Sequence, residues 1–387
     1  MVNTTLAETS TTLFHIAFLT YIAAMVAYFF RMAFTSPARS GIAGTDGDAA
    51  PGGLGIRVGQ LGTTLAVVGL AVHAASVVTR GLSVMRIPLA NMYEYSSLMA
   101  LVAIAVGLLV VQRRMGYGHV MGFVLAAGVL MMASGLLLFV EASPVMPALQ
   151  SYWLKIHVSS MMSSASVFIV AFAVTALYLV KDTAERRVAG QGRVGASSVG
   201  AARVAPPEDR PPGYRADAGL EGRGPLAPLA QRDALSPVLF PVVPFLVVGV
   251  FTLVVWRAPA AALIAGSIVA LLGTAAWYAV PSLPAAAKLD TLAYRIIAFG
   301  FPIFTFGVIA GAIWAEEAWG RYWGWDPKET GSFFTWTLYA AYLHARSTAG
   351  WRGRRAAWVA MAAFVALMVT YYAVNLWVVG LHSYAGV

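Results

Sequence analysis

Long apolar runs, separated by shorter polar segments, form the main pattern of this chain. A helix of about 20 residues crosses the roughly 30 Å hydrocarbon core of a bilayer. The runs predict ten such helices, near residues 11–31, 60–79, 95–112, 118–140, 156–180, 238–256, 259–280, 295–314, 327–346 and 356–379. The pattern therefore predicts an all-α fold, a polytopic transmembrane helix bundle of about ten spans.

Two segments lack such runs. Residues 182–235 are rich in Gly, Pro, Ala, Arg and Ser, which predicts a disordered cytoplasmic linker. It divides the chain into an N-terminal transmembrane bundle (1–181), the linker (182–235) and a C-terminal transmembrane bundle (236–387). An alternative role for the linker is to bind acidic lipid headgroups through its arginines. Residues 36–54 have the same character.

Composition excludes several classes of protein. A soluble core does not explain 59% hydrophobic and only 11% charged residues. Asn3 and Glu8, rather than a basic region, precede the first run, and no small-residue cleavage site follows it, so we expect a retained span and not a signal peptide. The chain has no cysteine. It therefore forms no disulfide, binds no metal through thiolate and carries no haem thioether of its own.

The distribution of basic residues predicts the orientation of the bundle. With the N-terminus outside, 20 of the 26 Lys and Arg residues fall on the inner side and 6 on the outer side. Long loops follow this rule poorly, but without the six arginines from Arg193 to Arg232 the inner side still holds 14. We therefore expect both termini on the outer, extracytoplasmic side.

A tryptophan-rich segment follows the eighth predicted span. Trp319, Trp323 and Trp325 lie within seven residues and are interleaved with Gly320 and Gly324. A membrane-interface belt needs fewer aromatic residues, and glycines let a flat ligand approach the backbone. The segment therefore predicts a platform for a large, planar, aromatic ligand on the outer face.

The next helix carries its own start signals. Asp326 is a typical N-cap, Pro327 suits the first helical position, and Glu329 completes a capping box. Capping alone is one interpretation of Asp326. A second role, in which its remaining carboxylate oxygen orients a tryptophan or a ligand, is compatible with capping.

The predicted topology sorts the histidines. His157 lies at the outer end of the fifth span and His382 just beyond the outer end of the tenth, on the same side as the tryptophans. Two imidazoles beside an aromatic platform suit a b-type haem with two axial histidines, although each could also be a hydrogen-bonded interface residue. His344, about 25 Å from Pro327 by helical rise, is either functional or faces the headgroups. His73 has a weaker claim of the same kind.

Several of these motifs resemble one family. The run Trp319–Thr330 and the tail Asn375–Tyr384 resemble the tryptophan-rich WWD domain and C-terminal signature of the CcsA (ResC) proteins of system II cytochrome c biogenesis. Tyr152–Val158 resembles their upstream histidine motif and Pro88–Glu94 their outer-loop motif. The resemblance covers most of the chain except residues 36–54 and 182–235. Gly331 departs from it, because many relatives have another tryptophan there.

The resemblance implies a function and a partner. Such proteins handle haem, and with a CcsB (ResB) subunit they form the holocytochrome c synthase, a lyase that joins haem vinyl groups to the thiols of an apocytochrome CxxCH motif. It also implies a plasma-membrane location with an extracytoplasmic active face, haem b as cofactor or substrate, possible thiol-reducing partners and no nucleic acid. No catalytic residue follows from it.

The resemblance also implies site residues. The external iron ligands would be His157 and His382, and His344 would ligate haem in the membrane with a second histidine from CcsB. The residues of the aromatic platform, Trp319, Trp323 and Trp325, are predicted to contact the haem, with Asp326 as a further binding residue.

Two alternatives remain open at this stage. A haem transporter or chaperone of the CcmC or CcmF type would share the tryptophan segment, but CcmC relatives are shorter and CcmF relatives much longer than this chain. A transporter of other solutes needs ionisable residues or broken helices that meet at mid-bilayer. His73 and His344 are predicted at different depths, which disfavours that class.

Overall fold

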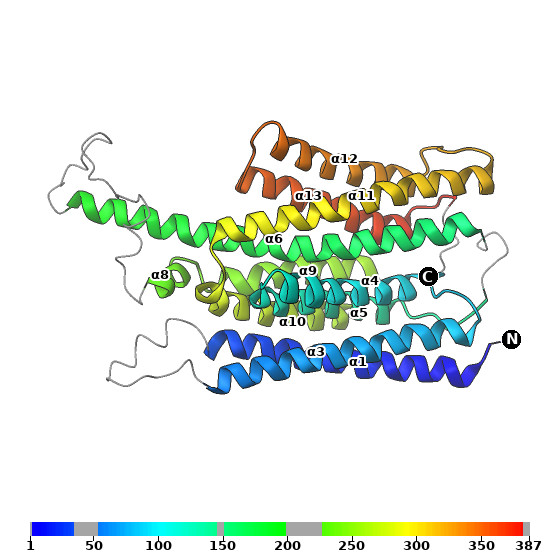
Figure 1. Cartoon of the computed structure of the whole chain (residues 1–387), viewed down its shortest axis with the longest axis horizontal. Helices are drawn as coiled ribbons and strands as arrows, with labels where there is room; N and C mark the ends of the chain where they lie inside the picture. The colour runs from blue at the N-terminus through cyan, green and yellow to red at the C-terminus, as the bar shows by residue number, and fades with distance from the viewer. Residues whose placement is uncertain (1, 35–52, 145–150, 199–226, 382–387) are drawn as a thin grey trace. The chain divides into compact units, whose positions relative to one another are not determined.

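The computed structural model describes residues 2–34, 53–144, 151–198 and 227–381, and these residues are helical without any strand (Figure 1). The all-α prediction is confirmed. The α-helices are α1 (Thr4–Phe34), α3 (Gly53–Ser83), α4 (Met92–Val106), α5 (Met121–Leu137), α6 (Tyr152–Ser198), α8 (Ala227–Asp233), α9 (Leu239–Trp256), α10 (Pro259–Ala279), α11 (Ala286–Trp319), α12 (Pro327–Ser347), α13 (Arg354–Val369) and α14 (Asn375–Trp377). Short 3-10 helices are η2 (Gly118–Val120) and η5 (Val280–Ser282), and π-helices are η1 (Gly107–Arg114) and η6 (Thr370–Val374).

A helix coincides with each of the ten predicted spans. In the described part of the chain, eight helices are long and apolar enough to cross a membrane, which makes this a multi-pass membrane protein. The apolar helix α9 is shorter than the other eight, and α12 is not among them. Helix α12 is less apolar than these eight helices because it carries polar residues, including Lys328, His344 and Arg346.

The chain folds into two compact units that interleave in sequence. Unit 1 comprises Met1–Phe29, Arg57–Tyr178 and Ala287–Val387, and unit 2 comprises Phe30–Ile56 and Leu179–Ala286. Each is described by itself below. The N-terminal and C-terminal portions of the chain therefore share unit 1, whereas the three-part division expected from the sequence followed chain order.

The predicted linker 182–235 differs from the structure at both ends. Helix α6 continues to Ser198, and α8 occupies Ala227–Asp233; residues 199–226, and 36–52 of the shorter segment, lie outside the described residues. Within unit 2, Asp182 Oδ2 lies 2.8 Å from Arg186 Nε one helical turn away, and Ala184 is fully buried. Alanine, arginine and glutamate favour helix, and this local propensity prevails over the Gly- and Pro-rich composition of the whole segment.

The outer-loop motif of unit 1 is built around one buried carboxylate. Glu94 in α4 is 2% exposed and accepts hydrogen bonds from Arg80 Nε at 3.0 Å and Arg86 Nη1 at 2.8 Å. The backbone N–H of Ala90 donates to it at 2.9 Å, and the Asn91 side chain caps the helix by accepting from the Glu94 N–H. The motif therefore fixes how the loop after α3 enters α4.

The π-helix η6 joins three parts of unit 1. The Tyr371 hydroxyl lies 2.8 Å from Ser96 Oγ in α4, and the Tyr372 hydroxyl donates to Ser134 Oγ in α5 at 2.7 Å. A π-turn rotates these adjacent side chains relative to a regular helix, and such turns often occur at functional sites. Here the turn holds the end of α13 against α4 and α5.

Candidate functional site

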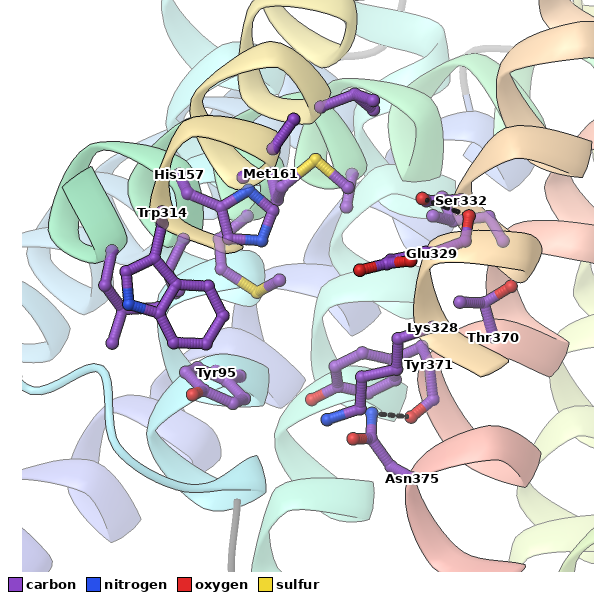
Figure 2. Close-up of a pocket in the computed structure, with 18 of the residues that line it drawn as sticks. Tyr95, His157, Met161, Trp314, Lys328, Glu329, Ser332, Thr370, Tyr371 and Asn375 are labelled. Atoms are coloured by element: carbon purple, nitrogen blue, oxygen red, sulfur yellow. Dashed lines mark hydrogen bonds between the residues drawn. The ribbon is translucent and has the colours of Figure 1, made fainter. Parts of the chain in front are cut away.

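An open cavity of about 170 Å³ lies within unit 1, among α4, α6, α11, α12 and η6. Figure 2 shows two facing walls: His157, Met161, Trp314 and Tyr95 on one side, and a more polar wall on the other. The polar wall carries Lys328, Glu329, Ser332, Thr370, Tyr371 and Asn375. The cavity thus combines apolar rings with ionisable groups.

His157 is held in a defined tautomer. Its Nδ1 lies 2.7 Å from the main-chain oxygen of Gly307 in α11. A carbonyl oxygen only accepts, so Nδ1 carries the proton and Nε2 keeps its lone pair. A hydrogen bond of this kind also orients metal-ligating histidines. His157 is therefore prepared to act as a neutral nitrogen ligand.

Gly311 makes the space that the imidazole occupies. A Cβ atom at this position would lie 2.5 Å from His157 Nδ1 and 2.6 Å from its Cε1. Any larger residue would push the ring away from α11 and disturb its hydrogen bond to Gly307. This pairing could not be predicted from local sequence patterns, because residues 157 and 311 are far apart in the chain.

Of the three predicted tryptophans, only Trp323 lines the cavity. Trp319 packs edge-to-face on the buried Trp314, with ring centroids 4.8 Å apart. Trp325 is 62% exposed and lies edge-on to Trp323 at 5.8 Å. Its φ of 58° falls in the left-handed region, which is uncommon for a residue other than glycine. The structure thus brings Trp323 together with His157, and Trp314 joins them although the sequence did not single it out.

The capping box at the start of α12 is confirmed. The Asp326 side chain accepts from the Lys328 N–H, and Glu329 Oε2 accepts from the N–H groups of Gly324 at 2.8 Å and Asp326 at 3.0 Å. These contacts fix the loop that carries Trp323 and Trp325. The second carboxylate oxygen, Glu329 Oε1, is buried and has no hydrogen-bond partner in the described part of the chain.

Asp326 also holds the C-terminal segment. Its Oδ1 accepts a hydrogen bond of 2.7 Å from the N–H of Leu381, and a Cβ atom at Gly380 would lie 2.6 Å from the same oxygen. Leu381 immediately precedes His382, which lies outside the described residues. The chain is thus tied to the N-cap residue of α12 one residue before the predicted second ligand.

Comparison with known proteins identifies the family of this chain. The sequence model described as "Cytochrome C assembly protein" matches residues 89–382, which include every residue that lines the cavity. The chain belongs to the cytochrome c assembly protein family. Membership supports a role in cytochrome c biogenesis and agrees with the family resemblance of its motifs.

Curated relatives bear the name expected from those motifs. The chain is similar to "Cytochrome c biogenesis protein CcsA" of Gloeothece citriformis, with 35% identity over 305 residues that cover 77% of this chain and 79% of the relative. It is 34% identical to the CcsA of Gloeobacter violaceus, over 84% of this chain and 86% of the relative. The CcsA of Rippkaea orientalis is also 34% identical, over 83% and 88%.

Two other histidines of this family member lie away from the cavity. His344 is exposed near the end of α12, where its main-chain oxygen accepts from the Thr348 N–H. His73 in α3 is fully buried, with Nε2 3.0 Å from Ser97 Oγ and its Nδ1 without a partner among the described residues. Neither contributes to the wall that carries His157.

The glycine at position 331, where the sequence departs from the family pattern, is a contact between helices. A Cβ atom there would lie 2.4 Å from Thr370 Oγ1 and 2.8 Å from its Cγ2. The π-turn of η6 thus brings Thr370 directly against α12. In this chain the side chain of Thr370 occupies the space that the Cβ atom of a larger residue at position 331 would need.

Proposed function

We propose that this chain is the haem-handling subunit of a system II cytochrome c synthase. It binds haem and presents it on the extracytoplasmic face of the plasma membrane, where a CxxCH apocytochrome receives it. The observation that carries this proposal is His157, whose Nδ1 donates to Gly307 while the ring borders the same cavity as Trp323. The family's role in cytochrome c biogenesis supports it.

The residues of the cavity fit haem as a substrate. The Nε2 of neutral imidazole is a good iron ligand, and the rings of Trp314, Trp323 and Tyr95 match the apolar faces of a macrocycle. On the opposite wall, Lys328 supplies a cation suited to propionate groups. Haem b is proposed because a macrocycle not yet attached to protein keeps both vinyl groups.

The mechanism consists mainly of binding and orientation. His157 would hold the iron through Nε2, and we propose His382 as a second ligand because the residue before it, Leu381, is hydrogen-bonded to Asp326 beside the cavity. Trp323 and Trp314 would pack against the bound ring and shield it from water. Two axial histidines suit transfer, because the histidine of an incoming CxxCH motif can replace one of them. Holding the vinyl edge and the thiols together lowers the entropic part of the barrier.

A second haem position is proposed at His344, in the membrane. One imidazole leaves an axial position open, so we expect the second ligand to come from a CcsB-type subunit. The exposure of His344 is compatible with contact to another chain.

Cytochrome maturation in cells tests the proposal. Cells that lack this gene are complemented with the wild-type chain or with His157→Ala, and attached haem is detected on denatured cytochromes. His157→Ala should abolish attachment. His15→Ala is a matched control, because His15 is exposed on α1 and, among the described residues, its hydrogen bond is to Thr11 of the same helix. Normal maturation with His157→Ala would show that His157 is not needed for attachment and would contradict the proposal.

A further inference from the structure

The two oxygens of the Glu329 carboxylate have different surroundings. Oε2 is fixed by the N–H groups of Gly324 and Asp326, whereas Oε1 is buried without a partner among the described residues. The whole residue is only 8% exposed and lines the cavity. Leaving a buried acceptor without a hydrogen bond is unfavourable, and more so for a charged group, so the retention of this carboxylate oxygen requires an explanation.

Neighbouring hydroxyl groups point to other acceptors. The Tyr371 hydroxyl bonds Ser96 and the main chain of Met92, and the Ser332 hydroxyl donates to the main-chain oxygen of Glu329 itself. Figure 2 shows the Glu329 carboxylate extending from its wall toward the side that carries His157. The other titratable groups that line the cavity are Tyr95, His157, Tyr322, Lys328 and Tyr371.

We propose that Glu329 is a catalytic residue that transfers the proton during thioether formation. The inference rests on the proposed function, since it concerns the reaction carried out on haem held by His157. A carboxylate whose one oxygen is locked by two N–H groups keeps the other in a constant position, which suits a proton acceptor.

The reaction balances without an oxidant or reductant. The thiol S–H bond breaks, an S–C bond forms at the vinyl carbon next to the macrocycle, and a C–H bond forms at the terminal vinyl carbon. Glu329 Oε1 accepts the proton from sulfur and returns it to the terminal carbon, so the carboxylate is regenerated. A positioned group of this kind contributes about 10²–10⁴-fold to the rate.

The main variant of the test, Glu329→Gln, preserves the shape of the side chain. The full-length chain is purified with its partner subunit and bound haem, and the attachment rate to a synthetic CxxCH peptide is measured. Glu329→Gln keeps an oxygen for the N–H groups of Gly324 and Asp326 but cannot take up a proton. Glu316→Gln makes the same chemical change at an exposed position outside the cavity.

We expect Glu329→Gln to bind haem with an unchanged spectrum and to attach it about 10²–10⁴-fold more slowly. Its residual rate should rise about tenfold per pH unit below the ordinary thiol pKa of about 8.5, because the peptide must then ionise by itself. The wild-type rate should depend less on pH. Glu316→Gln should behave as wild type, and Glu329→Asp, which keeps a carboxylate, should exceed Glu329→Gln.

Three results would overturn the inference. Attachment by Glu329→Gln at the wild-type rate, or equal rates for the Asp and Gln variants, would exclude a role in proton transfer. Loss of haem from Glu329→Gln would assign the residue to binding instead. If the wild-type complex binds haem but never attaches it, the proposed synthase function itself fails, and the wild-type sample thus distinguishes the two failures.

Discussion

At the scale of single residues, the site depends on a few side chains whose neighbours fix them. Gly307 sets the tautomer of His157, Gly311 gives its ring room, and the capping box at Asp326 and Glu329 holds the loop that carries Trp323. None of these contacts requires a bound ligand. The residues around the cavity are thus positioned in advance, which reduces the entropy lost on binding.

Trp323 should matter more for haem than Trp325. Trp323→Ala should weaken haem binding by about 1–2 kcal/mol, roughly tenfold, because its ring lines the cavity. Trp323→Phe should be milder, since it keeps an apolar ring. Trp325→Ala is the comparison at an exposed neighbour. The haem content of the purified variants, measured by absorption, checks this prediction. Equal loss of haem from Trp323→Ala and Trp325→Ala would contradict it.

Glu94 should be important for stability. Glu94→Gln leaves Arg80, which is 3% exposed, without its carboxylate partner, and breaking a buried ion pair in this way costs about 3–5 kcal/mol. Glu141→Gln makes the same change at an exposed position. Thermal unfolding in detergent should show a much lower midpoint temperature for Glu94→Gln and an unchanged midpoint for Glu141→Gln. Similar midpoints for both would mean that the ion pair contributes little.

At the scale of elements, chain-local signals predicted the helices better than the contacts between them. Apolar runs predicted a helix at every span, and the sequence Asp326-Pro327-Lys328-Glu329 predicted the start of α12 together with its cap. Such signals are read from adjacent residues. The placement of Gly311 against His157 and of Thr370 against Gly331 could not be read in this way, because each pair joins different helices.

The π-turn of η6 gives a prediction at this scale. Gly331→Ala places a methyl group against Thr370 Oγ1 and should destabilise the chain by about 1–3 kcal/mol, the usual cost of overpacking. The double variant Gly331→Ala/Thr370→Ala removes the two nearest side-chain atoms and should recover part of the loss. Gly53→Ala, where a Cβ meets nothing within 4 Å, is the control. Additive effects of the two substitutions in thermal unfolding would contradict the contact.

At the scale of the whole molecule, the sequence predicted a multi-pass bundle but divided the chain differently from the structure. The units interleave in sequence because α11 to α13 pack with helices from the N-terminal part of the chain. Local composition does not encode such long-range contacts. The helical extension of α6 past residue 182 was missed because averaging over a long segment hid a helix-favouring portion. Of the site residues predicted, His382 lies outside the described range, and the proposed ligand roles of His157 and His344 remain predictions.

Orientation in the membrane can be tested directly because the chain has no cysteine of its own. A single cysteine introduced at exposed Tyr322, beside the cavity, should react with a membrane-impermeant maleimide added to intact cells. A cysteine at exposed Arg352, between α12 and α13, should react only after the cells are opened. The reverse labelling pattern would place the cavity on the cytoplasmic side and contradict an extracytoplasmic active face.

The coordination of haem in the purified chain tests the central claim, that His157 ligates haem at this cavity. The measurement is the absorption spectrum of His157→Ala in a His344→Ala background, with and without added imidazole. We predict six-coordinate haem in the His344→Ala protein, five-coordinate haem after His157 is also removed, and partial recovery when imidazole fills the vacant axial position. An unchanged six-coordinate spectrum without His157 would show that the iron is held by other residues.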